Sequence, residues 1–137
     1  MLLVGCASPA TSPSKTTMTF ETIGSKGSMV FITLVSPSPD AVSNEDLANR
    51  LREDWQNHLV AGNMIEVKVF DNKDAPKRWL DIWGSLATMS DQDWAKEQAQ
   101  IFPHLIANYF KNKTSGLHQV EIMSRDTKGS IVRTIKF

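Results

Sequence analysis

Several short stretches of the chain have the hydrophobic pattern of β-strands, and the first two lie near the N-terminus. Residues 17–23 alternate between apolar and polar side chains, and residues 29–35 are apolar on both faces and rich in β-branched side chains. The glycine- and serine-rich segment 24–28 has the composition of a turn, so we predict a hairpin. Two prolines within residues 36–40 then end the sheet, because proline cannot donate to a strand ladder.

The clearest predicted helix begins after Ser43. The hydroxyl of Ser43 can cap the helix, and Asp46 lies near the positive end of the helix dipole. Apolar side chains recur at every fourth position along one face, namely at Leu47, Leu51, Trp55 and Leu59. Gly62 is predicted to end the helix, which we expect to lie across one face of a sheet.

The segment 64–104 combines a strand with weaker helical signals. Residues 64–70 alternate and predict a strand, and residues 71–76 have the composition of a polar loop. A helical turn is expected over residues 78–83. Ser90 can cap a second helix over residues 91–100.

The apolar side chains of residues 104–111 fit either a strand or a helix. We favour a strand, because Pro103 would interrupt a continuing helix and residues 112–116 resemble a hairpin turn. Residues 117–123 and 131–137 would then complete an antiparallel meander of three strands.

The predicted order of elements along the chain is ββ-α-β-α-βββ. Strands at both ends with helices between them indicate an α+β fold with a largely antiparallel sheet and one main amphipathic helix packed on one face. The chain has 137 residues, 41% hydrophobic and 22% charged, which suits one globular domain, expected over residues 17–137. The order of the strands in the sheet is left open.

The N-terminal residues have a character of their own. Cys6, the only cysteine, follows the apolar and small residues Leu3, Val4 and Gly5. This run resembles the lipobox of bacterial lipoproteins, in which a diacylglyceryl group is attached to the cysteine thiol and the peptide is cut just before that residue. The resemblance implies a lipid anchor of several acyl chains, such as palmitate, on Cys6, and several chains hold a protein at a membrane stably.

The same resemblance divides the N-terminus into two parts. Residues 1–5 would be the remnant of a signal peptide, whose apolar stretch normally has about 7–15 residues, so an upstream part is expected to be missing. Residues 6–16 would be the lipidated cysteine and a flexible Ser/Thr/Pro tether. Ala7 resembles the pattern that is sorted to the periplasmic side of the outer membrane in Gram-negative cells. The alternative is a chance match in an intracellular protein.

No motif for catalysis, a cofactor or a metal is recognisable. The chain has no glycine loop for phosphates and no Gly-x-Ser-x-Gly, and its three histidines lack metal-ligand spacing. Glu66 and Glu121 lie on predicted strands and would face either a cleft or water. Basic and acidic residues balance at 15 each, so nucleic acid is not an expected partner, and the basic bias of residues 103–137 is interpreted as ordinary surface.

Tryptophan is the unusual feature of the composition. Trp79, Trp83 and Trp94 fall in the least regular segment, and aromatic rings of this kind bind glycans and protein partners. The simpler interpretation is that these rings hold an irregular segment against the core. Trp55 lies on the helical stripe and is expected to be buried.

Taken together, these patterns favour a non-catalytic, lipid-anchored protein of the bacterial cell envelope that presents a small binding domain to a protein or cell-wall partner. The binding surface would be the tryptophan-containing segment 77–94, an exposed sheet face, or both. A small envelope hydrolase is the alternative, and it would require a pocket with converging carboxylate and histidine groups. The predicted hairpin could bring His104 and His118 together for this purpose. The oligomeric state is left open.

Overall fold

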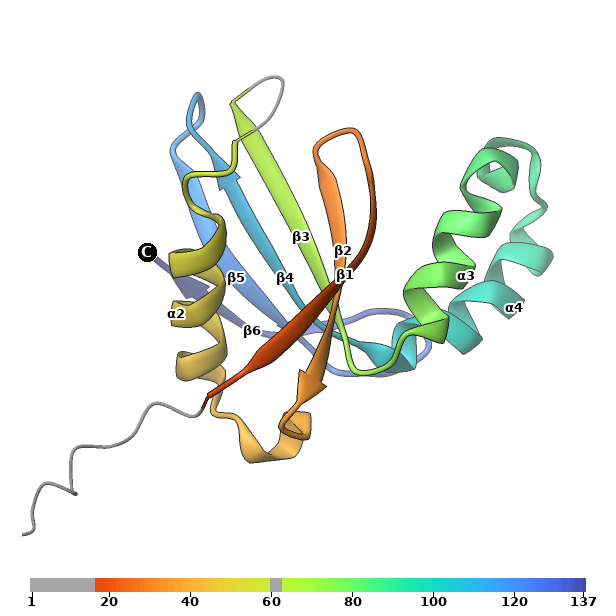
Figure 1. The fold of residues 1–137 in the computed structure, drawn as a ribbon. Coiled ribbons are helices and arrows are strands. Elements are labelled where there is room, and N and C mark those ends of the chain that lie inside the picture. Colours follow the sequence, from red (N-terminus) through yellow and green to blue (C-terminus); the bar gives the residue numbers. More distant parts are fainter. Residues whose placement is uncertain (1–16, 60–62) are drawn as a thin grey trace, which may run out of the picture.

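The computed structural model describes residues 17–59 and 63–137, so the predictions for Cys6, its tether and Gly62 lie outside the described residues. Six strands form one sheet, and their order in the sheet repeats their order along the chain (Figure 1). The strands are β1 (Thr19–Lys26), β2 (Met29–Ser36), β3 (Met64–Phe70), β4 (Leu105–Asn112), β5 (Leu117–Met123) and β6 (Ile131–Lys136).

All neighbouring strands pair antiparallel except β2 and β3, which run parallel. The α+β class and the largely antiparallel sheet are therefore confirmed. So are the N-terminal hairpin, the strand at residues 104–111 and the C-terminal meander. The parallel pair was not predicted, and it arises because the helix α2 (Asn44–Trp55) carries the chain back from the end of β2 to the start of β3.

The helix α2 begins as predicted and ends earlier. The Ser43 hydroxyl accepts a hydrogen bond of 3.0 Å from the backbone N–H of Asp46. Trp55 is the last helical residue, and the N–H of His58 donates to its carbonyl in the turn that follows. Asparagine and histidine are weak helix formers, which fits a helix end at this point. Leu59 still packs against the core from beyond the helix.

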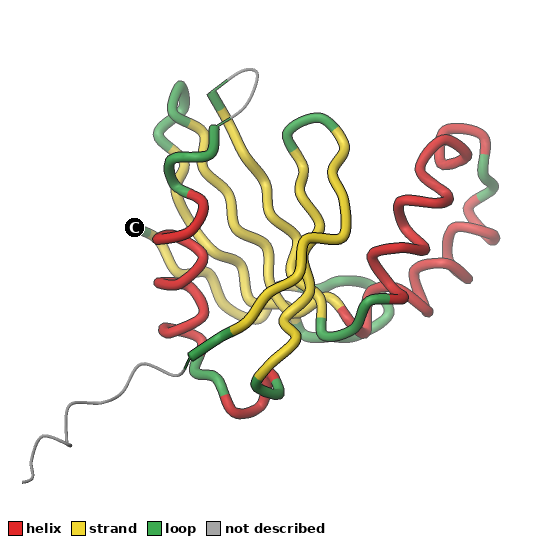
Figure 2. The backbone as a smooth tube through the Cα atoms, in the orientation of Figure 1, coloured by secondary structure: helices red, strands yellow, loops and turns green. Residues whose placement is uncertain are grey.

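Two further helices form a separate layer (Figures 1 and 2). They are α3 (Asp74–Ile82) and α4 (Asp91–Ile101), joined by the short 3-10 helix η3 (Trp83–Thr88). The described residues therefore contain three α-helices in two layers, where one main helix on one face of the sheet was expected. Residues 74–76 belong to the first turn of α3 and not to a loop, since proline is tolerated there and the Asn72 side chain accepts from the N–H of Ala75 at 3.1 Å. Ser90 caps α4 as predicted.

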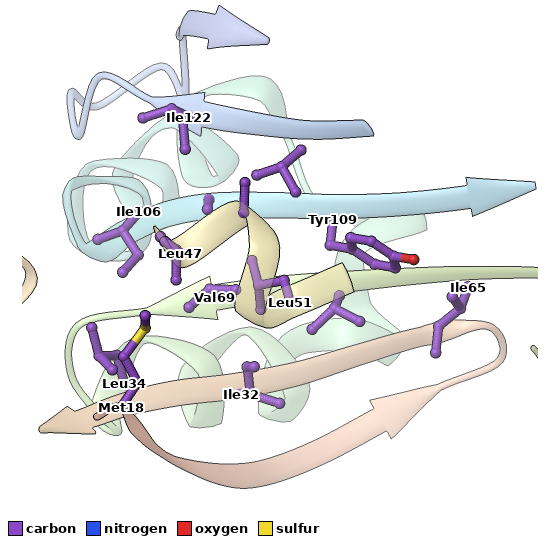
Figure 3. Packing of buried hydrophobic residues seen from close by; sticks show 14 residues of the cluster. Met18, Ile32, Leu34, Leu47, Leu51, Ile65, Val69, Ile106, Tyr109 and Ile122 are labelled. Atoms are coloured by element: carbon purple, nitrogen blue, oxygen red, sulfur yellow. The ribbon is translucent and has the colours of Figure 1, made fainter. Parts of the chain in front are cut away.

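The sheet buries apolar side chains on both faces, because successive residues of a strand point to opposite sides. On one face Leu47 and Leu51 of α2 pack over Ile32 and Tyr109, as Figure 3 shows. On the other face, Phe31 and its neighbours pack under α3 and α4. Fully burying a side chain of this size stabilises the fold by about 1.5–3 kcal/mol, so both helical layers contribute to stability.

Two short 3-10 helices complete the described chain. The first, η2 (Pro39–Ala41), leads from β2 into α2, and the second, η4 (Phe102–His104), leads from α4 into β4. In η4, Pro103 occupies one of the first two positions, which is consistent with its predicted role in stopping the preceding helix.

Candidate functional site

The sheet face under α3 and α4 changes character from one side to the other. On this face α3 packs against β1 and β2. From β3 outward the side chains become polar. The strand register places one residue of each strand from β2 to β6 in a single row: Phe31, Lys68, Asn108, Glu121 and Thr134. This row leads from the aromatic core beneath the helices to an exposed strand at the sheet edge.

Lys68 is the most buried charged group in this row, with 8% of its surface exposed. Its Nζ lies 2.8 Å from Glu66 Oε2 and donates to Asn108 Oδ1 at 3.1 Å. The same nitrogen lies 5.1 Å from the ring centroid of Trp79, within the range of a cation–π interaction. A buried ammonium is costly without such partners, so Lys68 is held in one position.

Glu121 brings a second carboxylate to the same place. It is half-buried, and Gln119 Nε2 donates to its Oε2 at 3.3 Å. Burial raises the pKa of Glu121, while the charge of Lys68 and a hydrogen bond from Asn108 oppose this rise. We refer to Glu66, Lys68, Asn108, Gln119 and Glu121 as the open-face network. It combines two carboxylates with one ammonium, which leaves it with spare hydrogen-bond acceptors.

A second polar cluster lies just after β3. Asp71 Oδ1 lies 2.8 Å from Nδ1 of His104, and the guanidinium of Arg125 binds the other oxygen of Asp71. The Asp71 side chain is only 12% exposed, whereas that of His104 is 41% exposed. Because the carboxylate holds Nδ1, the imidazole has a fixed orientation, and its Nε2 has no hydrogen-bond partner among the residues that the structure describes.

His104 borders a shallow depression of about 490 Å³ between α3 and the end of α4. Its lining includes the acidic side chains of Asp74 and Asp81 and the basic side chains of Lys77 and Arg78. Arg78 also donates two hydrogen bonds of 2.7 Å to a carboxylate of α4, that of Glu97, and these bonds raise the pKa of Arg78. The depression therefore offers both signs of charge and favours neither.

The two histidines proposed for a hydrolase do not meet. His104 precedes the first residue of β4, whereas His118 pairs with Lys111 near the other end of that strand. His118 Nε2 instead lies 2.8 Å from the hydroxyl of Tyr109. Burial lowers the pKa of His118, aided by the charges of Lys111 and Arg52, and burial raises the pKa of Tyr109 to about 12. Tyr109 and His118 are therefore hydrogen-bonded to each other across β4 and β5, away from His104.

The three candidate tryptophans all take part in packing the helical layer. Trp79 is 8% exposed, and its ring centroid lies 5.4 Å from those of Phe31 and Phe102. Trp83 makes an edge contact with Phe31, and Trp94 makes one with Phe102. Trp83 and Trp94 are only half-buried and keep part of their surface exposed, whereas Trp79 offers little to a partner.

Of the members of these clusters, the sequence pointed only to Glu66, Glu121 and His104, and their polar partners were not predicted. Glu66 and Glu121 were ambiguous between a cleft and water, and the structure places both on the open sheet face. Lys68 and Asn108 are 40 positions apart, and Asp71 and His104 are 33 apart. Only the strand register joins them, and the local pattern carries no signal for it.

Comparisons of the chain with protein-family models, with curated proteins and with solved structures found no match. Over residues 17–59 and 63–137, no helix has the length and apolar character that crossing a bilayer requires. In the same part of the chain, no group of three or more His, Cys, Asp and Glu side chains is placed to hold a metal ion.

Proposed function

We propose that this chain is a non-catalytic protein of the bacterial cell envelope, anchored by lipid on Cys6, that presents its domain to a protein or cell-wall partner. The single observation that carries the binding role is the open-face network. Three of its members, Glu66, Gln119 and Glu121, remain partly accessible, whereas Lys68 and Asn108 are buried beside the helical layer.

The chemistry of this surface favours a partner that donates hydrogen bonds. Lys68 is engaged by Glu66, Asn108 and the ring of Trp79, so its charge is largely satisfied within the domain. Glu121 has no such ammonium of its own, and its raised pKa reflects the cost of keeping that carboxylate charged. A hydroxyl, amide N–H or ammonium group from a partner would offset this cost.

The anchor is tested by comparing the native chain with Cys6→Ala in cells supplied with labelled fatty acid. The native form is expected to take up label and sediment with membranes, and the variant to do neither. If both forms are unlabelled and remain in the supernatant, the lipidation proposal is wrong.

The binding surface is tested by placing a photo-crosslinking amino acid at Gln119, on the open face. The matched control carries it at Asn49, an exposed position on α2 in the other layer. We expect a discrete crosslinked product from position 119 in intact cells, absent at position 49 and lost with Glu121→Ala. Equal crosslinking at the two positions would show that the open face is not the binding surface.

A small envelope hydrolase is the second candidate, and the contact between Asp71 and His104 is the observation that favours it. A carboxylate that orients an imidazole is the arrangement of a general base that activates water. If this function is correct, His104→Ala abolishes hydrolysis of purified cell-wall material by the chain. Asn49→Ala leaves that hydrolysis unchanged. Absence of hydrolysis by the native chain contradicts this candidate.

A further inference from the structure

The strand β6 leaves the edge of the sheet unusually accessible. Five of its six residues are exposed, including the apolar Ile131 at 50% and Val132 at 63%. Among the residues that the structure describes, β6 pairs only with β5. An exposed apolar edge strand is a template on which another extended segment can pair.

The outward backbone groups of β6 follow from its pairing with β5. The N–H of Phe137 donates to the carbonyl of His118 at 3.0 Å, so these two residues form a hydrogen-bonded pair. Residues of an antiparallel strand alternate in direction, and the register pairs Ile135 with Val120. The N–H and C=O groups of Ile135 therefore face β5, whereas those of Thr134 and Lys136 face the free edge.

The charge of this edge selects among the segments that could pair with it. The strand β6 contains Arg133 and Lys136 and no acidic residue. Arg133 is paired with Glu45 of α2, whereas Lys136 has no carboxylate partner among the described residues. A second copy of β6 would add two basic groups and no carboxylate, so it could not neutralise Lys136.

From these observations we propose that β6 binds an extended acidic segment of a partner protein as a seventh strand of the sheet. The backbone of the segment pairs with Thr134 and Lys136, its carboxylates lie on the face of the sheet that carries Lys136, and its apolar side chains lie on the opposite face, beside Ile135. The added strand extends the polar row beyond Thr134. This inference rests on the proposed partner-binding function, and it specifies that the partner presents an extended acidic segment.

The test uses the full-length chain and two peptides of about ten residues, the length of a long strand. One peptide alternates Glu with Val, and its matched control alternates Lys with Val. We expect the Glu peptide to bind at least about tenfold more tightly in calorimetry, with amide hydrogen exchange slowed at Thr134 and Lys136. The N–H of Ile135 is already bonded within the sheet, so its exchange should change little.

Two variants separate backbone pairing from side-chain recognition. Thr134→Pro removes an outward N–H and is expected to weaken binding of the Glu peptide at least about tenfold, because proline cannot donate to a strand ladder. Thr134→Ala loses the side chain but keeps the donor, and it should bind as the native chain does. Circular dichroism checks that the proline variant is folded, and the hydrogen-exchange result decides the question if it is not.

Four outcomes of the peptide experiments would overturn the proposal. They are equal affinity for the two peptides, no binding of the Glu peptide at about 1 mM, unchanged exchange at Thr134 and Lys136, and a folded Thr134→Pro variant that binds normally. A dimer in sedimentation that Thr134→Pro disperses would also overturn it, since the edge would then bind its own copy. If crosslinking at Gln119 succeeds while the Glu peptide does not bind, the proposed partner-binding function stands and only the proposal for β6 is wrong.

Discussion

Lys68 and Glu66 form an ion pair of 2.8 Å within a single strand, although they are only two positions apart. Side chains two positions apart on a strand point to the same face, and here the Lys68 ammonium also lies 5.1 Å from the ring centroid of Trp79. The side chains are only 10% and 17% exposed, so solvent screens the pair weakly. Each charge therefore needs the other to offset the free-energy cost of its burial.

Glu66→Gln should reveal this dependence. The substitution leaves the Lys68 ammonium with less compensation, and breaking a buried pair in this way costs about 3 kcal/mol. Urea denaturation would measure the loss in the free energy of unfolding. The double variant Glu66→Gln, Lys68→Met should recover most of it, because neither charge of the pair is then left. A double variant as unstable as the single one would contradict this explanation.

The raised pKa of Glu121 predicts a specific pH dependence of stability. The folded chain binds this proton more tightly than the unfolded chain, whose value is near 4.5. The resulting stabilisation is fully present below that value and is lost as pH rises through the raised pKa. Glu121→Gln imitates the protonated side chain, so its Tm should exceed the native Tm at about pH 7 and approach it in acid. A Tm difference that does not change with pH would refute this.

His118 predicts the opposite trend at higher pH. Its pKa is lowered from 6.5 by burial, so the unfolded chain takes up the proton first. Stability is present above the unfolded value and is lost as pH falls through it. The free energy of unfolding should therefore decrease between about pH 7 and about pH 5, and His118→Gln should flatten this part of the profile. Denaturant titrations across that range would detect either result.

Trp79 and Trp83 should differ sharply in their effect on stability. Trp79→Ala leaves a cavity among Phe31, Phe70 and Phe102, at a cost of about 3–5 kcal/mol. Trp83 is half-buried, so Trp83→Ala should cost less. Thermal unfolding of both variants provides the comparison. Equal losses would indicate that Trp83 carries more of the packing than its exposure suggests.

Local pattern was sufficient for most of the elements. Ser43 and Ser90 are recognisable as caps because capping involves neighbours three positions apart, and the alternation of residues 64–70 predicts a strand without any tertiary information. The helix α3 begins earlier than the helical turn predicted over residues 78–83, because Pro76 and its polar neighbours have the composition of a loop, although proline is also common in a first helical turn.

The candidate sites depend on contacts between strands, which local sequence pattern does not predict. Alternation predicts which residues share a face, but not which strands are neighbours. The approach of Asn108 to Lys68 requires β3 beside β4, and the approach of His104 to Asp71 requires the chain to return to the end of β3. Both follow from a strand order that several arrangements of the same elements could have satisfied.

That strand order also bears on how the chain is made. A protein is synthesised from its N-terminus, and each strand of this sheet is added next to the one that came before it. Two steps span long connections, that from β2 to β3 through α2 and that from β3 to β4 through α3 and α4. The later strands can join a growing edge one at a time without inserting between strands already paired, so the sheet can assemble in the direction of translation.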